Sequence, residues 1–278
     1  MQAKLSFEQF VAELDRLKSN NPATIAKACE LLKPYKVKRA VILAAGLSSR
    51  MRPATTALPK PMISIGKKRL IETQLDALIA AGITDITIVR GYRGSEFDAL
   101  LGKYPNLKFI NSSSWNVTGA IVSASLAIDL LANAYLIEGD LFIKNPKIIR
   151  SYEYCSSYCG ISGKVRHDWN FSVTPDGRVK KLVYGDSVAA HKFVGIMFWT
   201  AKDAKQLKVD LKMILQDPVH HQRFIESVPF DEHAGDYEIY ARKLHSEDVV
   251  EVDTYQELLS LQAREGRNKY SPKRSVTA

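Results

Sequence analysis

Apolar residues near the start of the chain recur at helical spacing. Between residues 6 and 18, one helix face collects Phe7, Phe10, Val11, Leu14 and Leu17. A second short helix is predicted to run to about Leu32, because Pro34 cannot continue it. The two helices could be the remnant of a helix-turn-helix module, but neither carries the basic face that DNA recognition needs. We therefore interpret residues 1–36 as a helical arm that packs on the domain after it.

From residue 38 onward, strand-like and helix-like patterns alternate. Short apolar runs predict strands at 39–44, 83–89, 107–110 and 134–138. Apolar residues at helical spacing predict helices at 70–81, 95–101 and 119–131. In the first of these helices, the side chains expected to face inward are Ile71, Leu75, Leu78 and Ile79. The alternation predicts an α/β fold whose parallel sheet is wrapped by helices and whose functional site lies at the carboxyl ends of the strands.

The pattern changes after Asp140. The strands expected there are 170–174, 178–184, 191–199 and 249–252, and the helices are 201–215 and others between 219 and 244. Pro175-Asp176-Gly177 is a hairpin turn between the first two strands. Thr254 and Glu257 form a capping box that opens a final helix.

These elements predict one main domain over residues 37–266, with an insertion at about 150–248. Residues 267–278 are polar and basic, and we expect them to be a disordered tail.

One loop carries the residues best suited to bind a phosphate. Residues 40–51 read AVILAAGLSSRM, and Lys60 follows between two prolines. The backbone N–H groups of residues 44–46 can approach phosphate closely, because their side chains are very small. Arg50 and Lys60 can then neutralise a polyphosphate.

Other loops that follow a strand fit this sequence less well. The strand alone would suit an ordinary βα turn. A dinucleotide-binding loop needs G-x-G-x-x-G, and Ser48 and Met51 stand where two of its glycines should be. A Walker A loop needs G-K-[ST], which the sequence never contains. The order of strand, loop, arginine and proline-flanked lysine favours a loop that binds a polyphosphate.

Two carboxylates, Asp140 and Asp253, each follow an apolar strand. At the ends of parallel strands they would point into one crevice and could hold Mg²⁺, which favours one or two carboxylates with phosphates and water. The alternative is that Asp140 is a turn residue and that Asp253 merely precedes a helix cap. Together with the loop, the pair predicts a magnesium site.

These residues resemble the signature of the sugar-nucleotide and cytidylyl transferase family, written L-A-A-G-x-G-x-R followed by K-P. Ser48 replaces the second glycine of that pattern. The resemblance covers roughly residues 37 to 262, and within the family the chain looks most like bacterial phosphocholine cytidylyltransferases and the related 2-aminoethylphosphonate cytidylyltransferases. The stretches that carry it are LAAGLSSR at 43–50, PKPM at 59–62, ITIVRGY at 86–92, AIVSASLA at 120–127 and VVEVDTYQEL at 249–258.

The resemblance implies a Rossmann-like fold with a mixed, mostly parallel sheet, CTP as donor, Mg²⁺ as cofactor and an insertion that binds the acceptor. It implies Arg50 and Lys60 as catalytic residues and Asp140 and Asp253 as metal ligands. The residues that it places along the nucleotide are Leu43, Ala44, Ala45, Gly46, Ser48, Gly91, Tyr92, Thr118, Gly119 and Ala120.

The acceptor region departs from the phosphocholine enzymes. Their Tyr-Asn pair is replaced by Val-Thr-Gly at 117–119, and no tryptophan stands beside Glu226. A trimethylammonium group is usually held by aromatic faces, whereas a primary ammonium needs hydrogen-bond acceptors. We therefore consider 2-aminoethylphosphonate as good a candidate acceptor as phosphocholine, or a slightly better one. The candidate acceptor-binding residues are Glu138, Asp168, Trp169, Lys192 and Glu226.

Two alternatives remain open at this stage. A sugar-1-phosphate or inositol-phosphate nucleotidyltransferase would share the loop and the metal carboxylates. A regulatory or nucleic-acid-binding protein could retain the fold without catalysis, but the intact loop cations and carboxylates argue against it.

Composition and charge restrict the partners and the cellular location that we expect for this protein. The 278 residues carry a net charge of +9, much of it clustered before the first strand and in the tail, which is more typical of a solvated surface than of a nucleic-acid groove. Three cysteines form neither a metal nor a disulfide pattern, and no signal-like or membrane-spanning run is found. We expect a cytoplasmic enzyme whose partners are CTP and a small anionic amino-alkyl acceptor, not nucleic acid or membrane. The sequence leaves a homodimer open.

Overall fold

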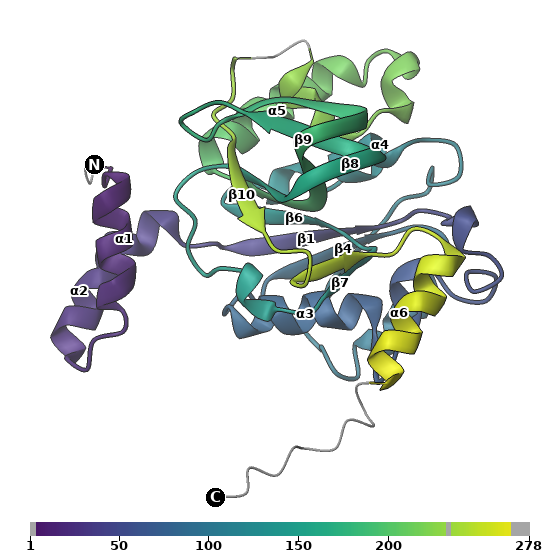
Figure 1. The fold of residues 1–278 in the computed structure, drawn as a ribbon, viewed down its shortest axis with the longest axis horizontal. Coiled ribbons are helices and arrows are strands. Elements are labelled where there is room, and N and C mark those ends of the chain that lie inside the picture. Colours follow the sequence, from purple (N-terminus) through teal and green to yellow (C-terminus); the bar gives the residue numbers. More distant parts are fainter. Residues whose placement is uncertain (1–3, 232–234, 268–278) are drawn as a thin grey trace, which may run out of the picture.

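The computed structural model describes residues 4–231 and 235–267. A seven-stranded sheet crosses the molecule (Figure 1). Its strands, in spatial order, are β10 (Tyr240–Leu244), β8 (Ser157–Val173), β9 (Val179–Trp199), β6 (Ala134–Glu138), β1 (Arg39–Ala44), β4 (Ile86–Arg90) and β5 (Lys108–Asn111). Within this sheet β9 alone runs antiparallel to its neighbours, so the sheet is mixed and mostly parallel, as predicted.

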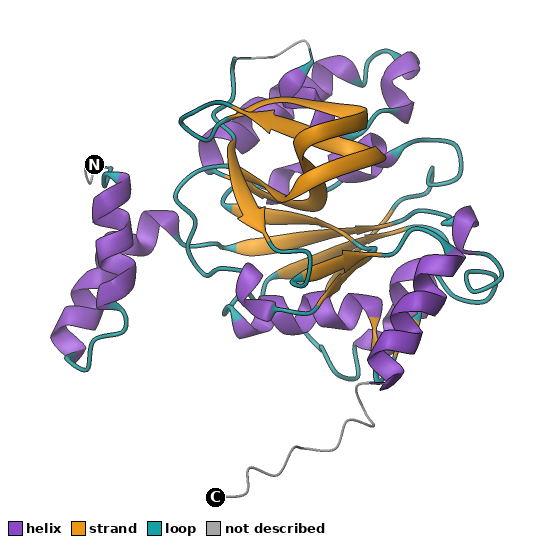
Figure 2. Cartoon of the chain, in the orientation of Figure 1, coloured by secondary structure: helices purple, strands orange, loops and turns teal. Residues whose placement is uncertain are grey.

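Helices cover both faces of the sheet, as Figure 2 shows. On one face lies α3 (Leu70–Ala80), and on the other lie α4 (Ala120–Ser125) and α5 (Ala201–Ile214). Successive side chains of β1 serve the two layers in turn, because Ile42 packs with the α3 cluster and Val41 with the α4 and α5 cluster. The carboxyl ends of β1 and β6 therefore emerge from a core that is packed on both sides.

Two small sheets complete the body. β2 (Ser64–Ile65) pairs with β3 (Lys68–Arg69), and β7 (Leu141–Ile143) pairs antiparallel with β11 (Val249–Glu251). Since β7 follows β6 almost directly, this pairing brings the end of the chain to the end of β6. The final helix, α6 (Tyr255–Arg267), then packs against the segment after β1 through a cluster that includes Met51 and Leu258.

Short 3₁₀ turns connect these elements. They are η1 (Lys33–Tyr35), η2 (Ser49–Met51), η3 (Lys60–Met62), η4 (Gly94–Leu100), η5 (Ile128–Leu130), η6 (Pro146–Ile148), η7 (Pro218–Gln222) and η8 (Ile225–Phe230).

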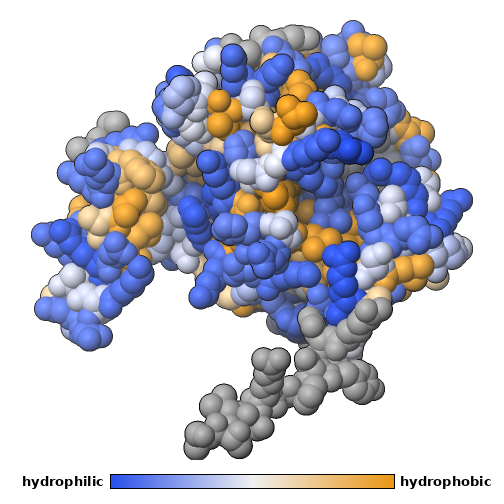
Figure 3. Space-filling view, in the orientation of Figure 1, coloured by the Kyte–Doolittle hydropathy of each residue, from blue (hydrophilic) through white to orange (hydrophobic). Residues whose placement is uncertain are grey.

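The first two helices, α1 (Phe7–Arg16) and α2 (Pro22–Leu32), form an arm at one side of the body (Figure 1). The arm contacts the body through a small cluster of Phe10, Leu32 and Tyr35 with the partly buried Tyr152 and Tyr154. Figure 3 shows apolar surface on the arm, where the Phe7 side chain is 61% exposed.

Several predicted elements are confirmed. β1 and β6 have the predicted bounds, and the turn at 175–177 joins β8 to β9. The capping box is also present, because the Glu257 carboxylate accepts the Thr254 N–H at 2.8 Å while Thr254 Oγ1 accepts the Glu257 N–H at 3.3 Å.

Four predictions in the first half of the domain are wrong in detail. The helix expected at 95–101 is the 3₁₀ turn η4. The strand expected at 83–89 begins at Ile86, because Gly82 (φ 76°) turns the chain and the Ile83 N–H bonds back to the Leu78 carbonyl at 2.9 Å. Ile79 was expected to face inward but is 43% exposed, since it lies about 100° beyond Leu78 around the helix. The helix expected at 119–131 ends at Ser125, and a 3₁₀ turn follows.

The segment between 219 and 244 contains no further α-helix among its described residues, which corrects the predicted helices there. Pro218 and Pro229 remove N–H donors from the backbone, so only the turns η7 and η8 form. Tyr240–Leu244 is instead a strand beside β8. The strand predicted at 191–199 is the last part of β9, and β8 begins well before the predicted residue 170.

Apart from Arg267, the last residue of α6, the predicted tail at 267–278 lies outside the described residues. Within the described ranges, no helix has both the length and the apolar character that crossing a membrane requires.

Candidate functional site

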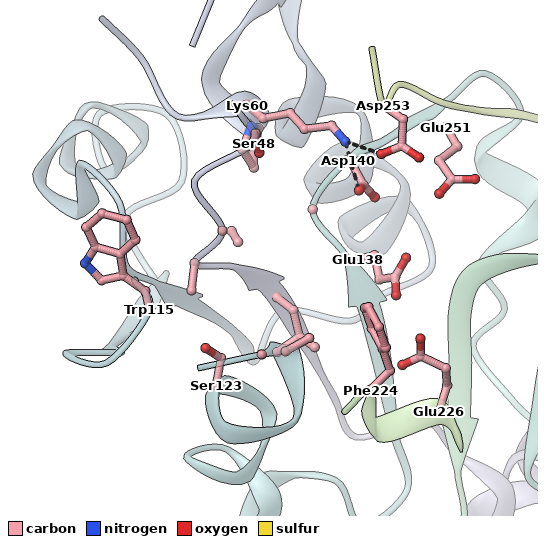
Figure 4. A pocket seen from close by; sticks show the side chains of 18 of the residues that line it. Ser48, Lys60, Trp115, Ser123, Glu138, Asp140, Phe224, Glu226, Glu251 and Asp253 are labelled. Carbon is pink, nitrogen blue, oxygen red and sulfur yellow. Dashed lines mark hydrogen bonds and ion pairs between the residues drawn. The ribbon is translucent and has the colours of Figure 1, made fainter. Parts of the chain in front are cut away.

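A cavity of about 300 Å³ opens at the carboxyl ends of β1 and β6 (Figure 4). Its lining residues are Leu43, Ala44, Ala45, Gly46, Ser48, Arg50, Lys60, Pro61, Trp115, Thr118, Gly119, Ala120, Ser123, Glu138, Gly139, Asp140, Asp168, Trp169, Phe193, Phe224, Glu226, Glu251 and Asp253. The structure thus brings together all the site residues predicted from the sequence except Gly91, Tyr92 and Lys192, which are not among the lining residues.

The loop after β1 forms one side of the cavity. A Cβ atom added to Gly46 would meet nothing within 4 Å, so the backbone of this loop faces open space. The segment after β4 supports the loop from behind, since the Tyr92 N–H donates to the Ala45 carbonyl at 3.0 Å. A Cβ at Gly91 would lie 2.7 Å from the same carbonyl oxygen, so this close approach requires glycine. Gly91 and Tyr92 therefore brace the loop.

Ser48 adopts a left-handed backbone conformation, with φ 52° and ψ 48°. Glycine adopts this region most easily, which explains why the family signature has glycine where this chain has serine. The Thr55 hydroxyl donates to the Ser48 carbonyl at 3.0 Å and helps to hold the turn. The next residues form η2, which carries Arg50.

Lys60 is buried beside two carboxylates. Its Nζ lies 3.0 Å from Asp140 Oδ2 and 2.9 Å from Asp253 Oδ1. Burial by itself would lower the pKa of Lys60, but Asp140 and Asp253 raise that pKa above its ordinary value. Arg50 approaches Asp253 from the solvent side, with 3.1 Å between Nη2 and Oδ1. Lys60 and Arg50 are thus both cationic and both next to the loop.

The acidic residues of the site come as two pairs with one residue between the members. Glu138 and Asp140 flank Gly139 at the end of β6, and Glu251 and Asp253 flank Val252 at the end of β11. Alternation in an extended chain turns both members of a pair to the same side, while Val252 is fully buried on the other side. The pairing of β7 with β11 then places the two acidic pairs next to each other.

Two buried contacts hold the first pair in position. The Gly139 N–H donates to the Leu43 carbonyl at 2.8 Å, which ties the end of β6 to the end of β1. The Gln74 amide of α3 donates to the carbonyls of Glu138 and Leu141, at 3.1 and 2.9 Å. Gly195 on β9 makes room for the Glu138 side chain, because a Cβ there would lie 2.4 Å from Glu138 Oε2.

Three of these carboxylates fit a divalent cation. Ligand atoms of Glu138, Asp140 and Glu251 all lie within 4.8 Å of one another. Asp140 Oδ1 is buried and has no hydrogen-bond partner among the described residues, so it is available to a cation. Oxygen ligands of this kind are those that Mg²⁺ prefers.

The sequence predicted a metal pair of Asp140 and Asp253, both at the ends of parallel strands. That geometric assumption is wrong for Asp253, because β11 runs antiparallel to β7 in a separate sheet. Asp253 is held by Lys60 and Arg50, and Glu251 also lies close to Asp140. The metal pair of Asp140 and Asp253 itself stays a prediction.

Burial and crowding perturb the acidic groups. Burial, followed by the neighbouring Glu226, raises the pKa of Glu138 well above its ordinary value. Burial also raises the pKa of Glu226 and of Glu251 to about 7, and Asp140 adds to both shifts. A cation among these groups would act in the opposite direction, since positive charge favours the carboxylate form.

The side of the cavity next to Glu138 is aromatic and acidic. The rings of Trp169 and Phe224 meet edge to face at 5.5 Å, and Trp169 meets Tyr184 in the same way at 5.7 Å. Glu226 is only 2% exposed and lies beside Phe224, as Figure 4 shows. This end offers an apolar wall with carboxylate oxygens next to it.

The remaining wall is made by the segment before α4. The Gly119 N–H donates to the His221 carbonyl at 2.6 Å, and a Cβ at Gly119 would lie 2.8 Å from the Gln222 carbonyl. Ser123 lines the cavity, and its hydroxyl lies 3.0 Å from that of Ser112. In Figure 4, Trp115 and Ser123 lie across the cavity from the row of carboxylates.

Sequence reasoning missed several lining residues, chiefly Glu251, Trp115, Ser123, Phe193 and Phe224. Glu251 could have been found, because it stands two residues before Asp253 in a strand whose alternate residues are valines. Trp115 and Ser123 carried no comparable signal, since their place depends on how the 112–123 segment folds over the loop.

The nucleotidyl transferase family model matches residues 39–153. A 2-aminoethylphosphonate cytidylyltransferase from Lancefieldella rimae is 30% identical over 223 residues, which cover 79% of this chain and 89% of that protein. This chain belongs to the nucleotidyl transferase family. A choline-phosphate cytidylyltransferase from Streptococcus pneumoniae is 27% identical over 226 residues, covering 81% of this chain and 96% of the relative.

Among solved structures, the CTP:phosphocholine cytidylyltransferase from Streptococcus pneumoniae superposes with a TM-score of 0.76 at 25% identity. The match covers 81% of this chain and 98% of that structure. The protein is therefore a nucleotidyltransferase with a nucleotide-diphospho-sugar transferase fold, as the sequence predicted.

Proposed function

We propose that this nucleotidyltransferase transfers CMP from CTP to a small amino-alkyl phosphonate or phosphate and releases pyrophosphate. The observation that carries the proposal is the charge of the cavity. Its described lining has two cations, Arg50 and Lys60, against six carboxylates: Glu138, Asp140, Asp168, Glu226, Glu251 and Asp253. Such an excess suits a metal ion together with a cationic acceptor, and the names of the two cytidylyltransferase relatives support the same class.

The donor triphosphate would lie along the loop after β1. Residues 44–46 line the cavity, and the space beside Gly46 is open, so backbone N–H groups there could approach phosphate closely. Lys60 and Arg50 stand at the same edge and would exchange part of their contact with Asp253 for contact with phosphate oxygens.

Mg²⁺ fits the carboxylates that face this edge. Asp140 would hold it together with Glu251 and Glu138, and Asp253 stays a predicted ligand. When bound, the ion would neutralise phosphate charge during transfer.

The chemistry needs little proton transfer from the protein. An acceptor phosphonate or phosphate is already an anion near neutral pH. One of its oxygens bonds to the α-phosphorus of CTP while the bond from that phosphorus to the β-phosphate oxygen breaks, and pyrophosphate leaves. The protein's part is to position the two anions and to stabilise the developing charge through Lys60 and Arg50.

The acceptor's amine would lie at the aromatic and acidic end. A primary ammonium donates hydrogen bonds, and Glu226 and Asp168 offer acceptors there. Trp169 and Phe224 could also contact a methylated ammonium. Because carboxylates outnumber exposed ring faces, we favour 2-aminoethylphosphonate over phosphocholine.

Pyrophosphate release tests the proposal directly. The protein is assayed with Mg²⁺ and CTP against 2-aminoethylphosphonate, phosphocholine, phosphoethanolamine and glucose-1-phosphate, with UTP as donor control. We expect release with CTP and an amino-alkyl acceptor, and the largest kcat/KM for 2-aminoethylphosphonate. Equal kcat/KM for 2-aminoethylphosphonate and phosphocholine would reject the acceptor preference, and release only with the sugar phosphate would reject the proposed class.

A further inference from the structure

Lys192 does not line the cavity, yet it binds two carboxylates that do. Its Nζ lies 2.7 Å from Asp168 Oδ2 and 2.9 Å from Glu251 Oε2. Asp168 belongs to the aromatic end of the cavity, and Glu251 belongs to the carboxylate group that fits a cation. One ammonium group therefore joins the two ends of the site.

The three side chains come from strands that are far apart in the sequence. Lys192 is on β9, between Ile161 and Asn170 of the two halves of β8. Glu251 is on β11, opposite Leu141 of β7. Local sequence sets none of these distances, so the contact exists only in the folded chain and depends on how β9 and β11 converge.

Glu251 needs such a partner to keep its place. Asp140 lies close by, and its negative charge opposes that of the Glu251 carboxylate. Among the described residues, Lys60 forms ion pairs with Asp140 and Asp253, and Glu251 forms its ion pair with Lys192. A charge-assisted hydrogen bond from Lys192 fixes one Glu251 oxygen and leaves the other for a ligand.

We propose that Lys192 is a positioning residue that holds Glu251 beside Asp140 for the metal and holds Asp168 at the acceptor end. This inference rests on the proposed function for its acceptor half. Its metal half concerns the free protein and can be measured without any substrate. Residues that orient metal ligands in this way typically change metal affinity by about 10- to 100-fold when they are replaced.

The test uses Mn²⁺ as the probe, because its coordination resembles that of Mg²⁺ and its binding can be followed by electron paramagnetic resonance. Mn²⁺ affinity of the full chain is measured without nucleotide for wild type, Lys192→Met and Lys192→Arg. Lys180→Met is the matched control, since Lys180 is an exposed lysine on the same strand. The KM for the acceptor and the KM for CTP are measured on the same variants.

We expect Lys192→Met to weaken Mn²⁺ binding by about 10-fold or more, and Lys192→Arg to restore part of it, because the charge returns. Acceptor KM should rise in Lys192→Met while CTP KM changes little. Asp168→Asn should raise the acceptor KM but leave Mn²⁺ binding unchanged, since Lys192 keeps its bond to Glu251.

Unchanged Mn²⁺ affinity in a folded Lys192→Met would overturn the proposal, whatever happens to turnover. If that variant melts below the assay temperature, Lys192→Gln is measured in its place, because it keeps a hydrogen-bond donor but removes the charge. Unchanged Mn²⁺ affinity in Lys192→Gln would likewise overturn the proposal. Should no acceptor be turned over at all, the proposed function fails, but the Mn²⁺ comparison still decides the role of Lys192 toward Glu251.

Discussion

In the structure without ligands, charged side chains of this site form ion pairs with one another. Lys60 is 6% exposed and lies between Asp140 and Asp253. A buried ammonium is stable there only because two carboxylates offset its loss of hydration. The same residue is next to the loop where phosphate would lie, so it can move its charge from carboxylate to phosphate over a short distance.

Replacing Lys60 by alanine should therefore lower kcat by about 10²–10³-fold, the usual effect of losing one group that stabilises transition-state charge. The measurement is pyrophosphate release under saturating CTP. Lys67→Ala, at an exposed lysine in the turn between β2 and β3, is the control and should keep full activity. Near-wild-type turnover of Lys60→Ala would remove Lys60 from the catalytic residues.

Gly195 supports the site in a different way. It has φ 31°, and an added Cβ would meet Glu138 at both Oε2 (2.4 Å) and Cβ (2.8 Å). Gly195→Ala should therefore displace the Glu138 side chain, weaken Mn²⁺ binding and cost about 1–3 kcal/mol of unfolding free energy through backbone strain. Gly102→Ala, where a Cβ meets nothing within 4 Å, serves as control. Unaltered Mn²⁺ binding in Gly195→Ala would mean that Glu138 does not contribute to the cation site.

At the scale of elements, four strands build the acidic part of the site: β6, β7, β9 and β11. They carry or position its carboxylates and the Lys192 ammonium that binds two of them. β6 and β11 each end in an acid pair, and the short sheet of β7 and β11 sets the distance between the pairs. β9 supplies Lys192 and leaves room for Glu138 through Gly195. The site is therefore as rigid as the pairing of these strands.

Arg242 on the outer strand β10 forms a buried ion pair with Glu153 and a hydrogen bond to Tyr135 on β6. Arg242 Nη1 lies 2.6 Å from Glu153 Oε1 and donates to the Tyr135 hydroxyl at 3.1 Å, while two other guanidinium nitrogens find no partner among the described residues. Arg242→Met should lower the unfolding free energy by about 3–5 kcal/mol, because the buried Glu153 charge then keeps only the Tyr135 hydroxyl and the more distant, exposed Arg150 as partners.

Urea unfolding of this variant and of the double variant Arg242→Met, Glu153→Gln tests the explanation. The double variant removes the stranded charge and should regain much of the loss. If the double variant is no more stable than Arg242→Met, the loss comes from packing and not from the unpaired carboxylate.

At the scale of the whole molecule, the arm and the catalytic body are separate packing units. The arm's core of Phe10, Leu32 and Tyr35 meets the body at Tyr152 and Tyr154 and shares no residue with the clusters around the sheet. The cavity lies at the carboxyl ends of β1 and β6, and none of its lining residues belongs to the arm. The arm should therefore affect stability more than turnover.

Phe10→Ala tests this separation. Removing a buried phenylalanine typically costs about 3–5 kcal/mol, so hydrogen exchange in α1 and α2 should accelerate while kcat stays unchanged. Phe7→Ala is the control, because Phe7 is 61% exposed. A fall in kcat for Phe10→Ala, with the body still folded, would show that the arm acts on the site.

Much of the fold was predictable because it depends on local pattern. Apolar runs and helical periods identified β1, β6 and α3, and small residues before Arg50 identified the phosphate loop. The segment from 219 to 244 was not predictable in the same way, because its apolar residues serve 3₁₀ turns and an added strand. The part of β8 before residue 170 was missed because it begins with buried residues that are mostly small or polar, and the exposed residues after them show no apolar alternation.

The sequence alone determined the family of this protein, the loop, its two cations and the two aspartates, because these sit in short motifs whose chemistry is local. The tertiary structure decided which carboxylates lie close to one another. Asp253 and Glu251 stand two residues apart at the end of β11, which pairs antiparallel with β7. Asp253 nevertheless binds Lys60, whereas Glu251 binds Lys192 and lies close to Asp140 and Glu138. Distances of this kind arise from the meeting of remote strands, and a single sequence does not encode them in any local pattern.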